Sequence, residues 1–204
     1  MIASIRKVLA IRESIQRDFP NLRRSKWYLK SPHTIVYRCI AWAACETHRS
    51  WWPMDCPRHL YPPEVYWPSH LPVSDESIAN FVNAFVDTKG YSPCGRDTSF
   101  EFGYQKVAIY AKSENGSLVT KHMARQHLLG FGWLSKLGTG RDIFHPKVED
   151  LHGNLYGTVE QVLKRSWPIA LSKGLAIPSS FRFFLYRVRH PSWVISNLLV
   201  FLLR

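Results

Sequence analysis

A cysteine and a histidine that could act together as nucleophile and base stand at Cys39 and His122. The β-branched run 34–37 predicts a strand that ends before Cys39, and the following run predicts a helix from Cys39 to about residue 49. Unpaired backbone N–H groups at a helix start favour a thiolate over a thiol. A nucleophilic cysteine also needs a base. His122, on a later predicted strand, is the candidate.

The third member of such a site is open at the level of sequence. Alternation along the strand around His122 places its side chain on one face, and a helix packed on that face would bring Cys39 close. Ser135 on the next predicted strand could orient the imidazole, and Asp142 and His145 are the alternatives. A buried core cysteine and a structural histidine remain the simpler interpretation of the two residues alone.

Length and charge indicate one domain with basic extensions. A chain of 204 residues suits a single domain with flanks or at most two small domains, and its net charge of +12 is unevenly distributed. Residues 1–30 and 160–204 are strongly basic, whereas residues 31–159 carry equal numbers of basic and acidic side chains. Such flanks could bind an anionic partner or a membrane surface, or could be solvated termini. No nucleic-acid-binding motif accompanies them, so nucleic acid is an unfavoured partner.

The use of cysteine indicates a reducing compartment. The four cysteines are too few and too irregularly spaced for a disulfide scaffold, and no signal peptide is evident, so a cytoplasmic location is expected. The apolar run 193–203 is too short to span a bilayer as a helix. It is interpreted either as an interfacial anchor or, slightly better, as a helix packed on the protein.

Periodicity and turn residues predict an α+β domain. The expected order is helix, strand, helix, loop, helix and then an antiparallel meander that starts with a hairpin at Asn115-Gly116. The predicted helices cover 3–18, 39–49, 74–89 and 146–151, the strands cover 34–37, 106–111, 118–125 and 133–136, and 156–163 is either a strand or a helix.

A second set of residues could bind zinc. Cys45-x-x-His48 and Cys56-x-x-His59 supply four nitrogen and sulfur ligands, which is the number that a tetrahedral structural zinc site needs. The short separation of the pairs and the plain alternative of a core cysteine make this the less favoured interpretation. No metal or cofactor is therefore expected.

A series of aromatic and polar motifs over residues 34–163 resembles a family of uncharacterised bacterial domains. The motifs are Tyr37-x-Cys39-Ile40-Ala41-Trp42-Ala43, Trp51-Trp52-Pro53, Tyr66-Trp67-Pro68, His122-x-Ala124-Arg125-Gln126, Trp133-x-Ser135-Lys136-Leu137-Gly138, Asp142-Ile143-x-His145 and Tyr156-Gly157. That family in turn is similar to circularly permuted, NlpC-like papain-fold enzymes. Arg38 stands where the family usually has an asparagine before the cysteine.

This resemblance implies a papain-like α+β domain at 34–163, between a helical extension at 1–33 and a basic, aromatic and apolar extension at 164–204. It implies a cysteine hydrolase or acyltransferase that acts on a peptide or another amide or ester through a thioester. Cys39 matches the nucleophile, His122 the base and Ser135 the third, polar residue. A non-catalytic binding or structural domain of the same fold is the alternative.

Overall fold

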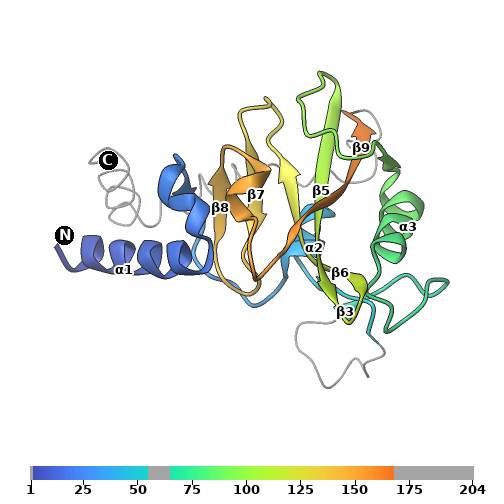
Figure 1. The fold of residues 1–204 in the computed structure, drawn as a ribbon, viewed down its shortest axis with the longest axis horizontal. Coiled ribbons are helices and arrows are strands. Elements are labelled where there is room, and N and C mark those ends of the chain that lie inside the picture. Colours follow the sequence, from blue (N-terminus) through green and yellow to red (C-terminus); the bar gives the residue numbers. More distant parts are fainter. Residues whose placement is uncertain (1, 55–64, 168–204) are drawn as a thin grey trace.

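A computed structural model describes residues 2–54 and 65–167 of the protein. Its centre is a seven-stranded sheet in which every neighbouring pair of strands is antiparallel (Figure 1). The strand order is β1 (Tyr28–Leu29), β8 (Asp142–His145), β7 (Trp133–Lys136), β6 (Ser117–Gln126), β5 (Tyr104–Glu114), β9 (Thr158–Ser166) and β4 (Ser92–Pro93). The fold is therefore α+β with a mainly antiparallel sheet, which confirms that part of the expectation.

Few helices accompany the sheet. They are α1 (Ile2–Asp18), α2 (Cys39–Ala43) and α3 (Ile78–Lys89), with short 3-10 turns η1 (Pro20–Arg24) and η2 (Val148–Leu151). Strands β2 (Ser50–Trp51) and β3 (Val65–Tyr66) form a separate parallel pair. Within the described ranges, no helix is long and apolar enough to cross a membrane.

The two faces of the sheet carry separate apolar clusters, because successive side chains of a strand point to opposite faces. Ala108 and Tyr110 of β5 belong to the cluster that packs with α1 and η1. Val107 and Ile109 belong to the cluster that packs with α2 and α3. The helix that carries Cys39 thus covers one face, and the N-terminal helix covers the other.

Three predicted elements near the cysteine need correction. Residues 34–37 form no strand, and β1 lies earlier in the chain and pairs with β8. The helix predicted to reach residue 49 stops at Ala43, and Cys45 follows in the left-handed conformation with φ 63°. The helix predicted to begin at Ser74 begins at Ile78. The preceding residue, Ser77, is its N-cap, and the Ser77 side chain accepts a hydrogen bond from the backbone N–H of Asn80.

The remaining predictions are confirmed more closely. The helix at 3–18 corresponds to α1, and α3 ends at Gly90 in the left-handed conformation. The hairpin turns at Asn115 and Gly116, both with positive φ. The strand at 133–136 is β7, the ambiguous segment 156–163 is the strand β9, and the short helix predicted from Pro146 is the 3-10 turn η2. The meander also contains β8, which the pattern had not indicated.

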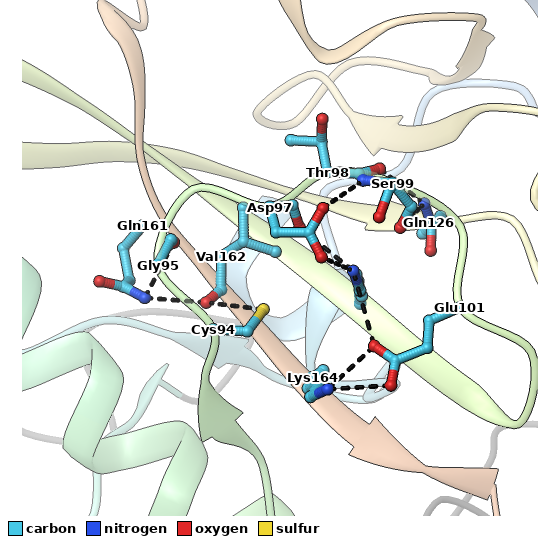
Figure 2. A network of polar contacts seen from close by, with 11 residues as sticks. Cys94, Gly95, Asp97, Thr98, Ser99, Glu101, Gln126, Gln161, Val162 and Lys164 are labelled. Atoms are coloured by element: carbon cyan, nitrogen blue, oxygen red, sulfur yellow. Dashed lines mark hydrogen bonds and ion pairs between the residues drawn. The ribbon is translucent and has the colours of Figure 1, made fainter.

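The connection from α3 to β5 is attached to the sheet by charged side chains. Lys106 of β5 is fully buried, and its Nζ lies 2.7 Å from an Asp97 carboxylate oxygen and 3.8 Å from Glu101. Figure 2 shows Asp97 and Glu101 pointing from this loop towards the strands, with Lys164 of β9 also bound to Glu101 at 2.9 Å. These contacts attach the loop to β5 and β9.

Both register shifts of the central strand β5 occur at Tyr110. The pairing with β6 shifts between Tyr110 and Ala111, and the pairing with β9 shifts between Ile109 and Tyr110. Gly157 lies beside this irregularity with φ 74°, and an added Cβ there would lie only 1.9 Å from the Ala111 carbonyl oxygen. Bulges of this kind re-aim the neighbouring side chains.

We predict that Gly157→Ala lowers the free energy of unfolding by more than about 2 kcal/mol, because it combines a left-handed backbone with a backbone clash. The matched control is Gly116→Ala, which has a similar φ of 80° but no atom within 4 Å of the new Cβ. The control should cost only about 1 kcal/mol, the conformational term alone. Chemical denaturation of both variants measures the difference, and equal losses would contradict the close approach at Gly157.

Candidate functional site

His122 lies on β6 inside a cluster of aromatic rings. Its imidazole is fully buried and stacks on Tyr156, with ring centroids 4.1 Å apart and planes 1° from parallel. Tyr110, its cross-strand neighbour on β5, presents a ring edge at 5.3 Å. The ring of His122 is therefore held in one plane by its neighbours.

A chain of hydrogen bonds leads away from one nitrogen of His122. Its Nε2 lies 3.1 Å from Ser135 Oγ, and the same Oγ lies 2.9 Å from His145 Nε2. The other nitrogen of His145, Nδ1, lies 2.7 Å from the Lys147 carbonyl oxygen. Ser135 and His145 belong to β7 and β8, so three adjacent strands contribute one side chain each.

The carbonyl oxygen at the end of this chain fixes the direction of every hydrogen bond in it. A carbonyl only accepts, so His145 Nδ1 carries the proton and, in the neutral ring, Nε2 accepts. Ser135 must then donate to His145, and its oxygen accepts from His122 Nε2–H. His122 Nδ1 is left as an unprotonated, buried nitrogen without a hydrogen-bond partner among the described residues.

The pKa values of both histidines agree with neutral rings. Burial, together with the charge of His145, holds the pKa of His122 well below its usual value. Burial lowers the pKa of His145 to about 4, against the hydrogen bond to the Lys147 carbonyl, which acts to raise it. At neutral pH the chain therefore presents His122 Nδ1 as an acceptor.

Cys39 is the first residue of α2 and is buried, with 6% of its surface exposed. Burial raises the pKa of its thiol, while the backbone N–H groups of Met123, Ile40 and Cys39 itself and the charge of Arg38 act to lower it. The predicted lowering of the Cys39 pKa by the helix start is therefore present, but burial outweighs it. The helix α2 has only five residues.

The structure brings His122 and Ser135 into contact. The expectation that the Cys39 helix packs on the face of the sheet that carries His122 is wrong, because α2 lies on the opposite face and Cys39 contacts the next residue of β6, Met123. Cys39 packs with Met123 in the cluster on the α2 face, whereas the ring neighbours of His122 belong to the cluster on the α1 face. The β6–β7 pairing ends at Ala124, so β7 does not pair with β6 at Met123. At this position the thiol of Cys39 contacts the backbone N–H of Met123. On the opposite face, burial raises the pKa of Tyr156, so its hydroxyl is neutral.

Asp142, one of the alternatives for the third residue, lies outside the histidine chain. Its backbone N–H donates to Ser31 Oγ, and its Oδ1 has no hydrogen-bond partner among the described residues. Burial raises its pKa to about 6, against the charge of Lys136. Of the three candidates, Ser135 contacts His122 directly and His145 contacts it through Ser135.

A cavity of about 460 Å³ lies on the α1 side, next to the aromatic stack. Tyr156 forms one part of its wall, α1 forms another through Ile15 and Asp18, and the loop 137–141 closes it. Neither Cys39 nor His122 lines this cavity, so the Tyr156 ring separates it from the imidazole.

The zinc interpretation is not supported by the residues that can be placed. Cys56 and His59 lie outside the described residues, and the His48 side chain is 72% exposed beside Glu46. Cys45 contacts the guanidinium groups of Arg125 and Arg165. In the described ranges, no three His, Cys, Asp or Glu side chains are grouped so that they could hold a metal ion.

Sequence reasoning did not assign a function to Tyr110 and Tyr156, which hold the imidazole. Tyr156 stood in one of the motifs, but only the fold shows its ring against His122. Tyr110 stood in an ordinary apolar strand pattern, and its hydroxyl donates to the Val148 carbonyl. No local signal marks such a ring, because the contact depends on the register of β5 and β6.

Residues 28–164 match the model of a family described as a domain of unknown function, DUF7689. The chain belongs to this family. The match begins at β1 and ends within β9, so it contains the whole histidine chain and Cys39 but leaves out α1. No curated protein and no solved structure matches the chain.

The buried histidines predict a loss of stability in acid. The unfolded chain binds a proton at His145 below about pH 6.5, and the folded protein does so only below about pH 4. Between these values stability should fall as the pH falls, by up to about 1.4 kcal/mol per pH unit and about 3 kcal/mol in total. His145→Gln should show a flatter dependence in denaturant unfolding between pH 7 and 4.

Asp142 acts with the opposite sign. Its folded pKa of about 6 lies above the unfolded value of 3.8, so it adds stability as the pH falls through 6. That contribution is common to wild type and His145→Gln and cancels in their difference. His48→Gln, which removes an exposed histidine, is the control. Equal slopes for wild type and His145→Gln would contradict the neutral, buried state of His145.

Proposed function

We propose that this DUF7689 domain is a papain-like cysteine hydrolase or acyltransferase that acts on an amide or ester through a thioester. In this proposal Cys39 is the nucleophile, His122 is the base and Ser135 orients the imidazole. The observation that carries it is the single unprotonated nitrogen of His122, Nδ1, which is buried without a hydrogen-bond partner among the described residues while Nε2 is fixed by Ser135.

The proposed orientation is supported by the chain behind Ser135. A serine alone is a weak orienting group, because its hydroxyl can rotate and can either donate or accept. Here the Lys147 carbonyl fixes His145, which in turn fixes the direction of the Ser135 hydroxyl. His145 is thus proposed as a positioning residue that acts on His122 through Ser135.

The proposed reaction starts from a neutral thiol and a neutral imidazole. His122 Nδ1 accepts the Cys39 proton as the sulfur attacks the substrate carbonyl, and it returns the proton to the departing amine or alcohol. The acyl group remains on Cys39 as a thioester. Water releases it in a hydrolase, and another amine or alcohol accepts it in an acyltransferase. Backbone N–H groups beside Cys39 would stabilise the oxyanion.

Access to this site requires a change at the aromatic stack or at Cys39. The thiol is nearly buried, and Tyr156 separates His122 from the neighbouring cavity. We therefore propose the cavity between α1 and loop 137–141 as the approach for substrate, with Tyr156 as the side chain that must move. Burial of both reacting groups also supports a second candidate, a domain that keeps the fold for binding without catalysis.

We predict that a small probe with an electrophilic carbonyl group labels Cys39, and that His122→Gln reduces the rate of labelling by about 10²-fold or more. The reason is that a thiol with a raised pKa reacts only when a base accepts its proton. Peptide-resolved mass spectrometry of the full chain measures the labelled residue and the rate. Cys39→Ala should abolish labelling at this peptide.

The matched control is Cys94→Ala, which removes a thiol on the far side of the sheet and should leave the labelling of Cys39 unchanged. Ser135→Ala should reduce the rate less than His122→Gln, since the imidazole remains but loses its orienting contact. Labelling of Cys39 that is equally fast with and without the His122 imidazole would contradict the enzyme proposal and favour the binding candidate.

A further inference from the structure

A second cysteine, Cys45, lies two residues beyond the last residue of α2 and contacts two buried arginines. Its Sγ lies 2.7 Å from Arg125 Nη1 and 3.4 Å from Arg165 Nη2. Arg125 is 7% exposed and Arg165 is 1% exposed. Two guanidinium groups thus converge on one sulfur atom in the protein interior.

Neither guanidinium has a carboxylate within ion-pair distance in the part of the chain that the structure describes. The other contacts of Arg125 are the Trp42 carbonyl and the Trp42 ring. Those of Arg165 are Gln105 Oε1, the Lys89 carbonyl and the Tyr91 ring. All of these groups are neutral, and buried cations without an anion are costly.

Glu46, the acidic residue that follows Cys45 in the chain, is already ion-paired with other cations. Lys89 Nζ lies 2.6 Å and Arg49 Nε lies 2.7 Å from its two oxygens, and Trp51 donates to it as well. Against the effect of burial, these hydrogen bonds lower the pKa of Glu46 to about 2. Its charge is therefore balanced without Arg125 or Arg165.

The other polar groups around Cys45 cannot supply the missing negative charge. Burial raises the pKa of Tyr91, and its hydroxyl donates to Gln105 Oε1 at 2.9 Å. Gln105 Oε1 lies 4.0 Å from Cys45 Sγ, at the outer limit of a thiol hydrogen bond, and it also accepts both Nε and Nη2 of Arg165. This crowded oxygen is therefore a poor acceptor for the proton of a thiol. Asp142 acts on Arg125 only from beyond ion-pair distance.

The backbone at Cys45 indicates that its side chain is needed. The residue has φ 63° at the end of a helix, a position where glycine is the usual residue. The nearby carbonyls of α2 disfavour a negative charge there, so only the arginine pair can stabilise one.

We propose that Cys45 is a thiolate at neutral pH, held by Arg125 and Arg165, and that it is a site of oxidation by hydroperoxides. The sulfur attacks one peroxide oxygen, the O–O bond breaks, and an S–O bond forms. The sulfur is oxidised by two electrons to sulfenic acid and the peroxide is reduced to hydroxide, which takes the sulfenic proton to leave water and a sulfenate. The sulfenate keeps the negative charge between the two guanidinium groups.

Cys94 provides an internal comparison. Its thiol lies 3.4 Å from the Val162 carbonyl, an acceptor, as Figure 2 shows, and burial raises its pKa. Cys94 is thus a hydrogen-bond donor to a carbonyl, whereas Cys45 accepts from two cations. The reactivity of Cys45 should therefore depend much less on pH than that of Cys94.

The first test is peptide-resolved alkylation of the reduced full chain by iodoacetamide between pH 6 and 8. As the pH is lowered from 8 to 6, the rate at Cys45 should change less than about threefold, whereas the rate at Cys94 should fall about tenfold per pH unit, as for an ordinary thiol. Arg165→Gln should make the Cys45 rate fall as the pH is lowered. Arg96→Gln, an exposed control, should not change the pH dependence at Cys45. A Cys45 rate that follows that of Cys94, or no modification of Cys45 at any pH, would overturn the proposal.

The second test uses peroxide and a charge series. Hydrogen peroxide should oxidise Cys45 at least about tenfold faster than Cys94, with sulfenate trapped at that peptide. Cys45→Asp, which keeps an anion, should retain a higher Tm than Cys45→Ser, which has no charge. Equal peroxide rates at the two cysteines, or a Ser variant as stable as the Asp variant, would overturn the proposal.

Discussion

The register of β5 against β6 and β9 is the constraint on which both polar sites depend. One pairing puts His122 opposite Tyr110, and another puts Arg165 opposite Gln105. Because the side-chain period of a strand is two, a slip of one residue would move these side chains to the wrong faces. The histidine chain and the arginine pair would then lose their partners together. The two register shifts at Tyr110 therefore help to set which side chains face each other in the candidate site.

The sheet separates two ways of burying polar groups. On the α1 face, His122, Ser135 and His145 are neutral and satisfy one another in a directed chain that ends on a carbonyl. On the α2 face, Arg125 and Arg165 bring permanent charge into the interior. Neutral groups need hydrogen bonds when buried, but charged groups also need a counter-charge. This difference is why the arginine pair, unlike the histidine chain, requires an anion.

The fold was predictable where a local rule applied. Helical spacing predicted α1, the Asn115-Gly116 pair predicted the hairpin, and Gly90 predicted the end of α3. The short strand β8 had no such signal, because its four residues mix charged and aromatic side chains and gain their structure from pairing. The helix at Cys39 was overestimated, since the left-handed Cys45 is held by tertiary contacts that no window of sequence contains.

The candidate site was predictable in part for the same reason. The contact of His122 with Ser135 was predicted from neighbouring strands, and it is present at 3.1 Å. The competition among Ser135, Asp142 and His145 could not be resolved from sequence, because it depends on β8 lying next to β7. Ser135 and His145 belong to the same chain of hydrogen bonds, and Asp142 lies apart from it. Cys45 was considered only as a zinc ligand or a core cysteine, since its arginine partners come from distant strands.

The two cysteines at the ends of α2 differ in a way that follows from what surrounds each sulfur. Cys39 has backbone amides and one nearby arginine, and burial outweighs them, so its pKa is raised. Cys45 has two guanidinium groups in direct contact. An amide contributes a partial charge and a guanidinium a full one, and the low dielectric of the interior magnifies the difference. The two proposals therefore differ in chemistry: base-assisted attack on a carbonyl is proposed for Cys39, and direct reactivity towards electrophiles is proposed for Cys45.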